Sequence, residues 1–187
     1  ADLAEMTRLS EQAMKVGAIG FGTSRSISHR DNRGNAVPTR RAAEAELLAF
    51  AQGMEQAGHG VIEAIFDMGH IEHEFAMLKR IAAETRRPVS FTLAQTLEHP
   101  DAWRKGLPLL KEANEEGLRM KGQIIGRPTG LMLGFGVSYN PFSLRPSYLA
   151  LDALPQEEKV AQLRRPEIRA RILAEADGPA KDHALIF

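Results

Sequence analysis

The fold class is decided by one stretch of the chain, Gly60-Val61-Ile62-Glu63-Ala64-Ile65-Phe66-Asp67. This stretch is mostly apolar, starts with β-branched residues and is bounded by glycines, which is typical of a short buried strand. Two carboxylates interrupt it. Because successive side chains of a strand point to opposite faces, Glu63 and Asp67 are predicted to share a face with Val61 and Ile65.

A buried strand that carries acids on one face needs an explanation, because an unpaired buried charge is costly. One interpretation is structural: Asp67 caps the following helix and Glu63 pairs with a nearby Arg or Lys. The other is functional: both acids line the interior and mouth of a parallel barrel, where catalytic groups sit at the carboxyl ends of strands.

The segments around this strand alternate in type. Strands are expected at 18–23, 60–67, 89–95 and 118–125, and the connecting segments have helical periodicity at 2–16, 41–56, 72–86 and about 100–116. Such alternation predicts an α/β fold with parallel strands and right-handed crossovers. Four strands of this kind fit half of a (β/α)₈ barrel, or an open sheet.

The periodic pattern breaks after Ile125, where glycine and proline become frequent. We therefore expect a parallel half barrel over residues 1–125. Residues 126–187 are expected to form a Gly/Pro-rich loop and short helices, at 155–163 and 166–176, of the same domain.

The composition of the chain narrows its class. The 187 residues include 43% hydrophobic residues, enough for a sizeable core, and the 24 basic and 24 acidic residues balance. The balanced charge does not favour a nucleic-acid or membrane partner, and without cysteine there are no disulfides or thiolate ligands. No apolar run approaches the roughly 20 residues of a membrane span, so a cytoplasmic protein is expected. Because the first residue is Ala, the chain is expected to be processed, trimmed or a fragment.

Several polar residues follow the expected strands and are candidates for a site. Arg25 and Arg127 are expected to bind a substrate carboxylate, the alternative being an ion pair with Glu63 or Asp67. His70 and His73 have a spacing that can hold a metal from one helix face, although solvated side chains explain it as well. His29 and His99 are isolated histidines after strands. Gly20-Phe21-Gly22 lacks the third glycine of a dinucleotide-binding fingerprint, so a nucleotide-binding domain is disfavoured.

Four segments together resemble the N-acyl-D-amino-acid deacylases of the amidohydrolase superfamily. They are Gly17 to Arg25, Arg87 to Leu93, Arg127 to Leu131 and Arg165 to Arg171. The resemblance covers roughly residues 17–176 and implies the middle portion of a (β/α)₈ barrel. It also implies a hydrolase that uses a divalent metal, zinc, to cleave a C–N amide bond of an N-acyl amino acid or a similar small amide.

The chain departs from that family in two ways. It is much shorter, and the two mid-barrel strands that usually end in metal-binding histidines contain none here, so no metal ligand is carried over. The candidate catalytic residues are Glu63 and Asp67. The alternative is a non-catalytic fragment or an oligomerising domain that lacks the metal site, because an open half barrel exposes edges and faces that need covering. The expected partners are a small-molecule substrate and either a second copy or the remainder of a longer chain.

Overall fold

A computed structural model describes residues 2–26, 29, 31, 35–96, 99–127, 132–136 and 140–178. The chain divides into two compact units. Unit 1 lies within residues 1–29 and 36–127, and unit 2 lies within residues 30–35 and 128–186. Each unit is described by itself.

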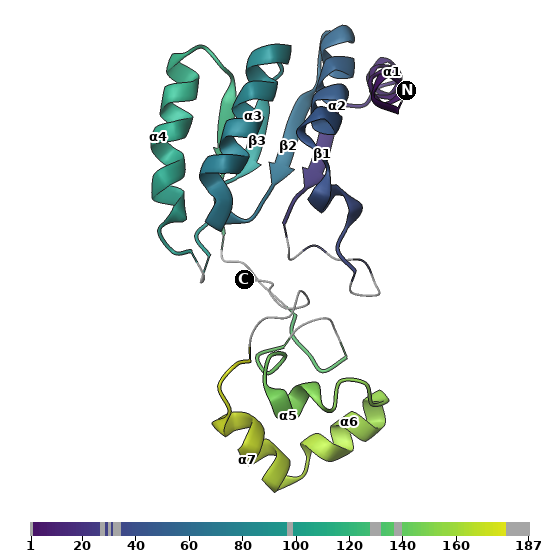
Figure 1. Ribbon diagram of the computed structural model, residues 1–187, viewed down its shortest axis with the longest axis vertical. Coiled ribbons are helices and arrows are strands. Elements are labelled where there is room, and N and C mark those ends of the chain that lie inside the picture. Colours follow the sequence, from purple (N-terminus) through teal and green to yellow (C-terminus); the bar gives the residue numbers. More distant parts are fainter. Residues whose placement is uncertain are drawn as a thin grey trace. The chain divides into compact units, whose positions relative to one another are not determined.

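Unit 1 is built on a parallel sheet of four strands. The strands are β1 (Gly20–Ser24), β2 (Val61–Ile65), β3 (Val89–Thr92) and β4 (Met120–Gln123). Their order in the sheet follows the sequence, β1-β2-β3-β4, and every neighbouring pair is parallel (Figure 1). The α/β class with parallel strands is therefore confirmed.

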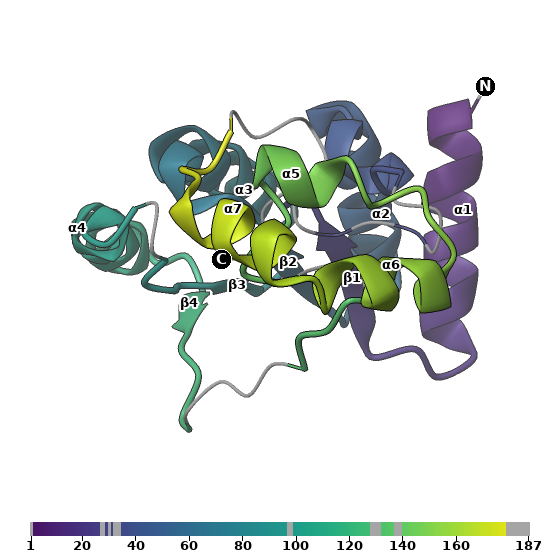
Figure 2. The same ribbon diagram turned by 90° about the horizontal axis from the view of Figure 1, so that it is seen from below.

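The three crossover helices lie on the same face of this sheet, as Figures 1 and 2 show. They are α2 (Glu44–Gln56), α3 (Ile71–Thr85) and α4 (Ala102–Glu115). This one-sided arrangement follows from the strand order, because right-handed crossovers between successive neighbours place every helix on one side. The strand side chains that point toward the helices are buried, among them Ile62, Ala64, Val89, Phe91 and Met120.

The alternate strand residues point to the face that the helices of unit 1 leave uncovered, which we call the open face. Ten residues form it: Gly20, Gly22, Ser24, Val61, Glu63, Ile65, Ser90, Thr92, Lys121 and Gln123. Their side chains are half-buried on β2 and β3, apart from the exposed Val61, and exposed on β4. Ser90 thus shares a face with Thr92, and Lys121 with Gln123.

The core fills the space between the sheet and the helices. Phe75 of α3 meets Phe91 of β3 edge to face, with ring centroids 5.6 Å apart. The first helix, α1 (Asp2–Lys15), packs against α2, and their closest approach is at Gly53. A Cβ atom at Gly53 would lie 2.3 Å from the carbonyl oxygen of Thr7, so only glycine allows this crossing.

Both edge strands are partly capped by side chains. Asn114 of α4 donates from Nδ2 to the carbonyl oxygen of Met120 (3.0 Å) and accepts the Met120 N–H at Oδ1 (3.4 Å). At the other edge, Thr39 donates its hydroxyl to the carbonyl oxygen of Ser24 (2.6 Å). These bonds satisfy backbone groups that a neighbouring strand would otherwise bind.

The described residues of unit 2 contain three short helices, α5 (Pro146–Leu149), α6 (Gln156–Leu163) and α7 (Pro166–Ala174). The two helices expected from the sequence are present, whereas α5 lies in the stretch that was expected to be a Gly/Pro-rich loop. Tyr148 of α5 is buried, and its hydroxyl accepts a hydrogen bond from Asn140 Nδ2 at 2.8 Å. Across the described part of the chain, none of the helices has both the length and the apolar character to cross a membrane.

Candidate functional site

The carboxyl ends of β1 and β2 bring together polar residues that are far apart in the sequence. The backbone N–H of Arg25 donates to the carbonyl oxygen of Ile65 at 2.8 Å, which continues the parallel ladder one residue beyond β1. Ser26 and Asp67 each lie two residues beyond the end of their strand. Because parallel strands end at the same edge, this is the position where α/β folds place their ligands.

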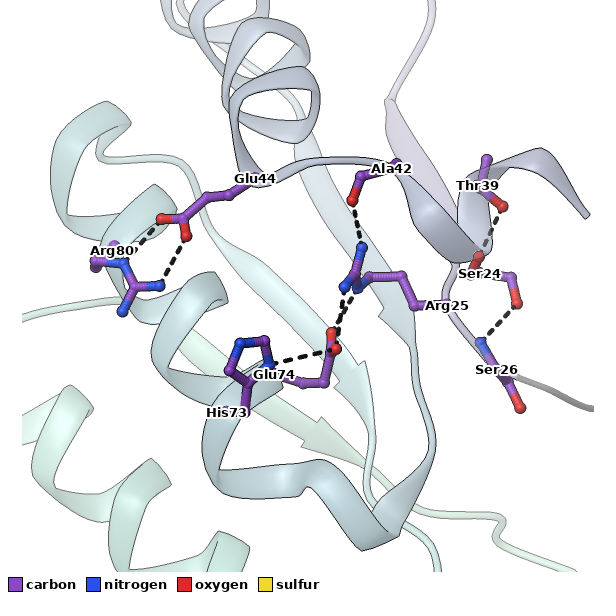
Figure 3. Close-up of polar contacts among 9 residues, drawn as sticks. All are labelled: Ser24, Arg25, Ser26, Thr39, Ala42, Glu44, His73, Glu74 and Arg80. Atoms are coloured by element: carbon purple, nitrogen blue, oxygen red, sulfur yellow. Dashed lines mark hydrogen bonds and ion pairs between the residues drawn. The ribbon is translucent and has the colours of Figure 1, made fainter.

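Arg25 is held by a buried ion pair. Its Nε and Nη2 atoms donate to the two carboxylate oxygens of Glu74 on α3, at 2.6 and 3.1 Å (Figure 3). Its Nη1 atom donates to the carbonyl oxygen of Ala42 at 2.5 Å. Only 13% of the Arg25 side chain and 11% of the Glu74 side chain are exposed. The guanidinium is therefore engaged with three oxygens, and its ion pair is with Glu74 rather than with Glu63 or Asp67.

Asp67 accepts a hydrogen bond from the neighbouring strand end. The Ser26 hydroxyl donates to Asp67 Oδ1 at 2.7 Å. Asp67 precedes a short 3₁₀ helix, Met68–His70, but its side chain makes no capping hydrogen bond there. The interpretation of Asp67 as a helix cap is therefore wrong, and its carboxylate instead faces a hydroxyl at the sheet edge.

Glu63 lies away from this edge, in the middle of β2 on the open face. It is level with Gly22 of β1 and with Ser90 of β3. Asp67 is four positions further along the chain and lies beyond the end of β2, a span of about 13 Å for extended backbone. The two carboxylates are therefore not a pair that shares one proton or one ligand.

Arg127 is exposed at the end of unit 1, four residues beyond β4. It follows β4, which lies two strands from β2 and three from β1 in the sheet. Its expected role in binding a carboxylate stays a prediction.

The histidines near the site are mostly solvated. His70 and His73 are exposed, and His73 Nδ1 lies 3.6 Å from Glu74 Oε1. The His99 ring lies over Gly69, where a Cβ atom would come within 2.4 Å of Nε2. No cluster of three or more His, Asp or Glu side chains suited to a metal occurs among the described residues. The zinc that the family resemblance implies therefore has no complete ligand set there.

A second ion pair lies beside the site and is more exposed. Arg80 of α3 donates two hydrogen bonds to Glu44 at the start of α2, at 2.8 and 2.7 Å (Figure 3). These hydrogen bonds lower the pKa of Glu44 below its ordinary value, and burial opposes this only in part.

The sequence predictions missed the role of Glu74, a residue of the first turn of α3. Its spacing from Ile71 and Leu78, three and four residues away, places it on the buried face of that helix. That spacing was the available signal. A carboxylate on a buried face predicts a buried cationic partner.

Comparisons of this chain with protein-family models, with curated proteins and with solved structures gave no match.

Proposed function

We propose that this chain is part of a hydrolase that cleaves the C–N amide bond of an N-acyl amino acid or a similar small amide. The observation that carries the proposal is the Ser26–Asp67 hydrogen bond at the carboxyl ends of β1 and β2. It supplies a carboxylate, oriented by a hydroxyl, at the edge where parallel α/β folds bind ligands. The resemblance to the deacylases supplies the reaction class.

In this proposal Asp67 is the general base. Its carboxylate takes a proton from the water that attacks the amide carbonyl carbon, and it returns that proton to the nitrogen as the C–N bond breaks. Ser26 holds the carboxylate through its hydroxyl. Arg25 is a positioning residue, because its pairing with Glu74 fixes the end of β1 beside Asp67. No step is assigned to a metal, since the described residues do not supply its ligands.

The test is amide hydrolysis by the purified protein. A panel of N-acyl amino acids is incubated with it, and release of the free amine is measured. The Asp67→Asn variant is expected to lower kcat by roughly 10²- to 10⁴-fold, because a positioned base contributes about that much. Glu72→Gln is the matched control, since Glu72 is exposed on the first turn of α3.

The outcome also decides between the two candidate carboxylates. If Glu63→Gln abolishes the reaction while Asp67→Asn keeps it, the base is the mid-strand carboxylate. If both variants keep the full rate, or if the wild-type protein releases no amine from any substrate, the proposal is wrong.

A second candidate is a non-catalytic oligomerising domain. It is favoured by the open face, which the helices of unit 1 leave uncovered and which carries charges of both signs. Wild-type protein that self-associates without hydrolysing any amide would support this alternative.

A further inference from the structure

The open face carries residues in rows that cross all four strands. One row is Gly22, Glu63, Ser90 and Lys121, each level with the next. The rows above and below it also begin with a small residue on β1. The β1 edge has only Gly20, Gly22 and Ser24, whereas the β4 edge has Lys121 and Gln123. The β1 edge of the face therefore has almost no side chains projecting from the sheet, and we call it the low edge. The β4 edge is lined by long side chains.

The low edge has free space above it. A Cβ atom at Gly22 would meet no other atom within 4 Å, and Gly22 is exposed. By contrast, Lys121 has a long flexible side chain that extends from the opposite edge into solvent. The two edges are therefore complementary in shape to each other, although they belong to the same face.

Two residues of this row, Glu63 and Lys121, carry opposite charges. Within the part of unit 1 that the structure describes, neither Glu63 nor Lys121 makes an ion pair or a side-chain hydrogen bond. On the helix-covered side, cations such as Arg80 and Lys79 are paired with carboxylates at 2.7 and 2.8 Å. An acid and a base in one row can both be paired by a surface that offers the opposite charges at the same level of the sheet.

We propose that the open face is covered by the open face of a second copy of this chain, related by a two-fold axis that runs along the strands. This rotation reverses the strand order, so β1 of one copy lies over β4 of the other. Lys121 then lies over Gly22 of the second copy, where there is room for it, and Glu63 lies over Ser90. The Lys121 ammonium group comes beside Glu63 of the second copy, in the adjacent strand.

In a two-fold interface each favourable pairing occurs twice, because both copies use the same surface. The central strand β2 contributes Val61 and Ile65, which supply apolar contact between the two polar edges. Faces of two sheets pack about 10 Å apart, a distance that long side chains such as lysine can span. The face is therefore complementary to itself in shape, charge and polarity.

The experiment is sedimentation velocity on the whole chain, with charge reversals at the two partners. The wild type is expected to sediment as a dimer with twice the chain mass of 20.6 kDa. Glu63→Lys and Lys121→Glu should each raise the dimer dissociation constant by about tenfold or more, because each places like charges side by side. The double variant exchanges the two charges and should restore the dimer.

Mixing provides the sharpest comparison. Equimolar Glu63→Lys and Lys121→Glu chains should form a heterodimer, since each acid of one chain then meets a base of the other. Gly22→Leu should also weaken the dimer, by filling the space that Lys121 of the second copy needs. Glu55→Lys, at an exposed residue of α2, is the matched control and should leave the dimer unchanged.

The proposal is overturned if the wild type is a monomer over the measured concentration range. It is also overturned if the charge reversals leave the dimer intact, or if the double variant and the mixture fail to restore it while circular dichroism shows folded chains. Amide hydrolysis is measured separately, so these outcomes do not depend on the proposed function.

Discussion

Arg25 connects three elements through one guanidinium group. It extends β1, binds Glu74 of α3 with two hydrogen bonds and binds the carbonyl oxygen of Ala42, two residues before α2. Because Glu74 is buried, removal of Arg25 leaves a carboxylate that is desolvated and has lost its bidentate partner. Breaking a buried pair in this way is far more costly than never having had it.

Arg25→Ala is expected to lower the free energy of unfolding by about 3–5 kcal/mol, measured by urea denaturation. Arg25→Lys should recover only part of this, because an ammonium group cannot bind both carboxylate oxygens with the geometry of a guanidinium. The control is Arg80→Ala, whose pair with Glu44 is 58% and 39% exposed and should contribute at most about 1 kcal/mol. Equal losses for Arg25→Ala and Arg80→Ala would contradict this explanation.

The Glu175 carboxyl group in unit 2 is expected to make the stability of the protein depend on pH. Ser147 donates its hydroxyl and its backbone N–H (2.9 Å) to the Glu175 carboxylate, and the hydroxyl bond is the main cause that lowers its pKa below 4.5. Since the pKa is lower in the folded state, this contribution to stability is present above the unfolded pKa. It is lost as the pH falls through the folded pKa.

The Ser147→Ala variant should therefore raise the pKa of Glu175 toward 4.5, while the backbone N–H keeps part of the shift. The measurement is an NMR titration of the Glu175 carboxyl carbon. Ser143→Ala, in the same unit, is the control, because Ser143 bonds the backbone N–H of Asn140 instead. An unchanged Glu175 pKa in Ser147→Ala would show that the hydroxyl is not the cause.

At the scale of elements, the crossing of α1 and α2 depends on Gly53. A Cβ atom at this position would lie 2.3 Å from the Thr7 carbonyl oxygen and 2.6 Å from Ser10 Cβ. The backbone atom cannot move without moving α1. A larger residue at position 53 would therefore have to move the whole of α1 and not just one side chain.

Gly53→Ala is expected to destabilise unit 1 by roughly 1–3 kcal/mol, the usual cost of overpacking. The direction of this change in stability distinguishes the two effects, because alanine in a helix normally stabilises a protein relative to glycine by about 0.5–1 kcal/mol. Gly106→Ala in α4 is the comparison, since a Cβ there meets the flexible ends of Ile71 and Leu93. Thermal denaturation that shows Gly53→Ala to be the more stable protein would contradict this account.

The sequence predicted which segments form strands better than it predicted the residues at which those strands end. The expected strand at 60–67 is β2 at Val61–Ile65, because the chain turns into a 3₁₀ helix after Asp67. The expected strand at 118–125 stops at Gln123, and the side chains of Ile124 and Ile125 are exposed beyond it. Periodicity reports which residues are apolar, whereas a strand's length depends on its neighbours.

The candidate site was predicted only in part, for a similar reason. The position of Asp67 at a strand end follows from the local pattern, but its bond from Ser26 depends on the pairing of β1 with β2. The partner of Arg25 is 49 residues away on another helix. Contacts of this range are set by the fold, and a single sequence does not display them.

At the scale of the whole molecule, the proposed second copy makes thermal stability depend on concentration. Association stabilises the folded state by mass action, so the thermal midpoint of the wild type should rise as the protein is concentrated above its dissociation constant. Differential scanning calorimetry over a hundredfold range of concentration measures this. The Glu63→Lys variant should show a flatter dependence, and a wild-type midpoint that does not change would argue against the dimer.

The Asn114 bonds to Met120 have a consequence for how the sheet forms. An amide side chain only six residues earlier occupies both backbone groups at the start of β4. The outward-facing backbone groups of Met120 can therefore be hydrogen-bonded by a residue close in sequence, and this does not require contact with a distant part of the chain. In hydrogen exchange, the Met120 amide should be protected although it belongs to a terminal strand, and Asn114→Ala should open it to solvent. At the outer edge of β4, the Asn114 side chain thus makes the hydrogen bonds that a fifth strand would make with Met120.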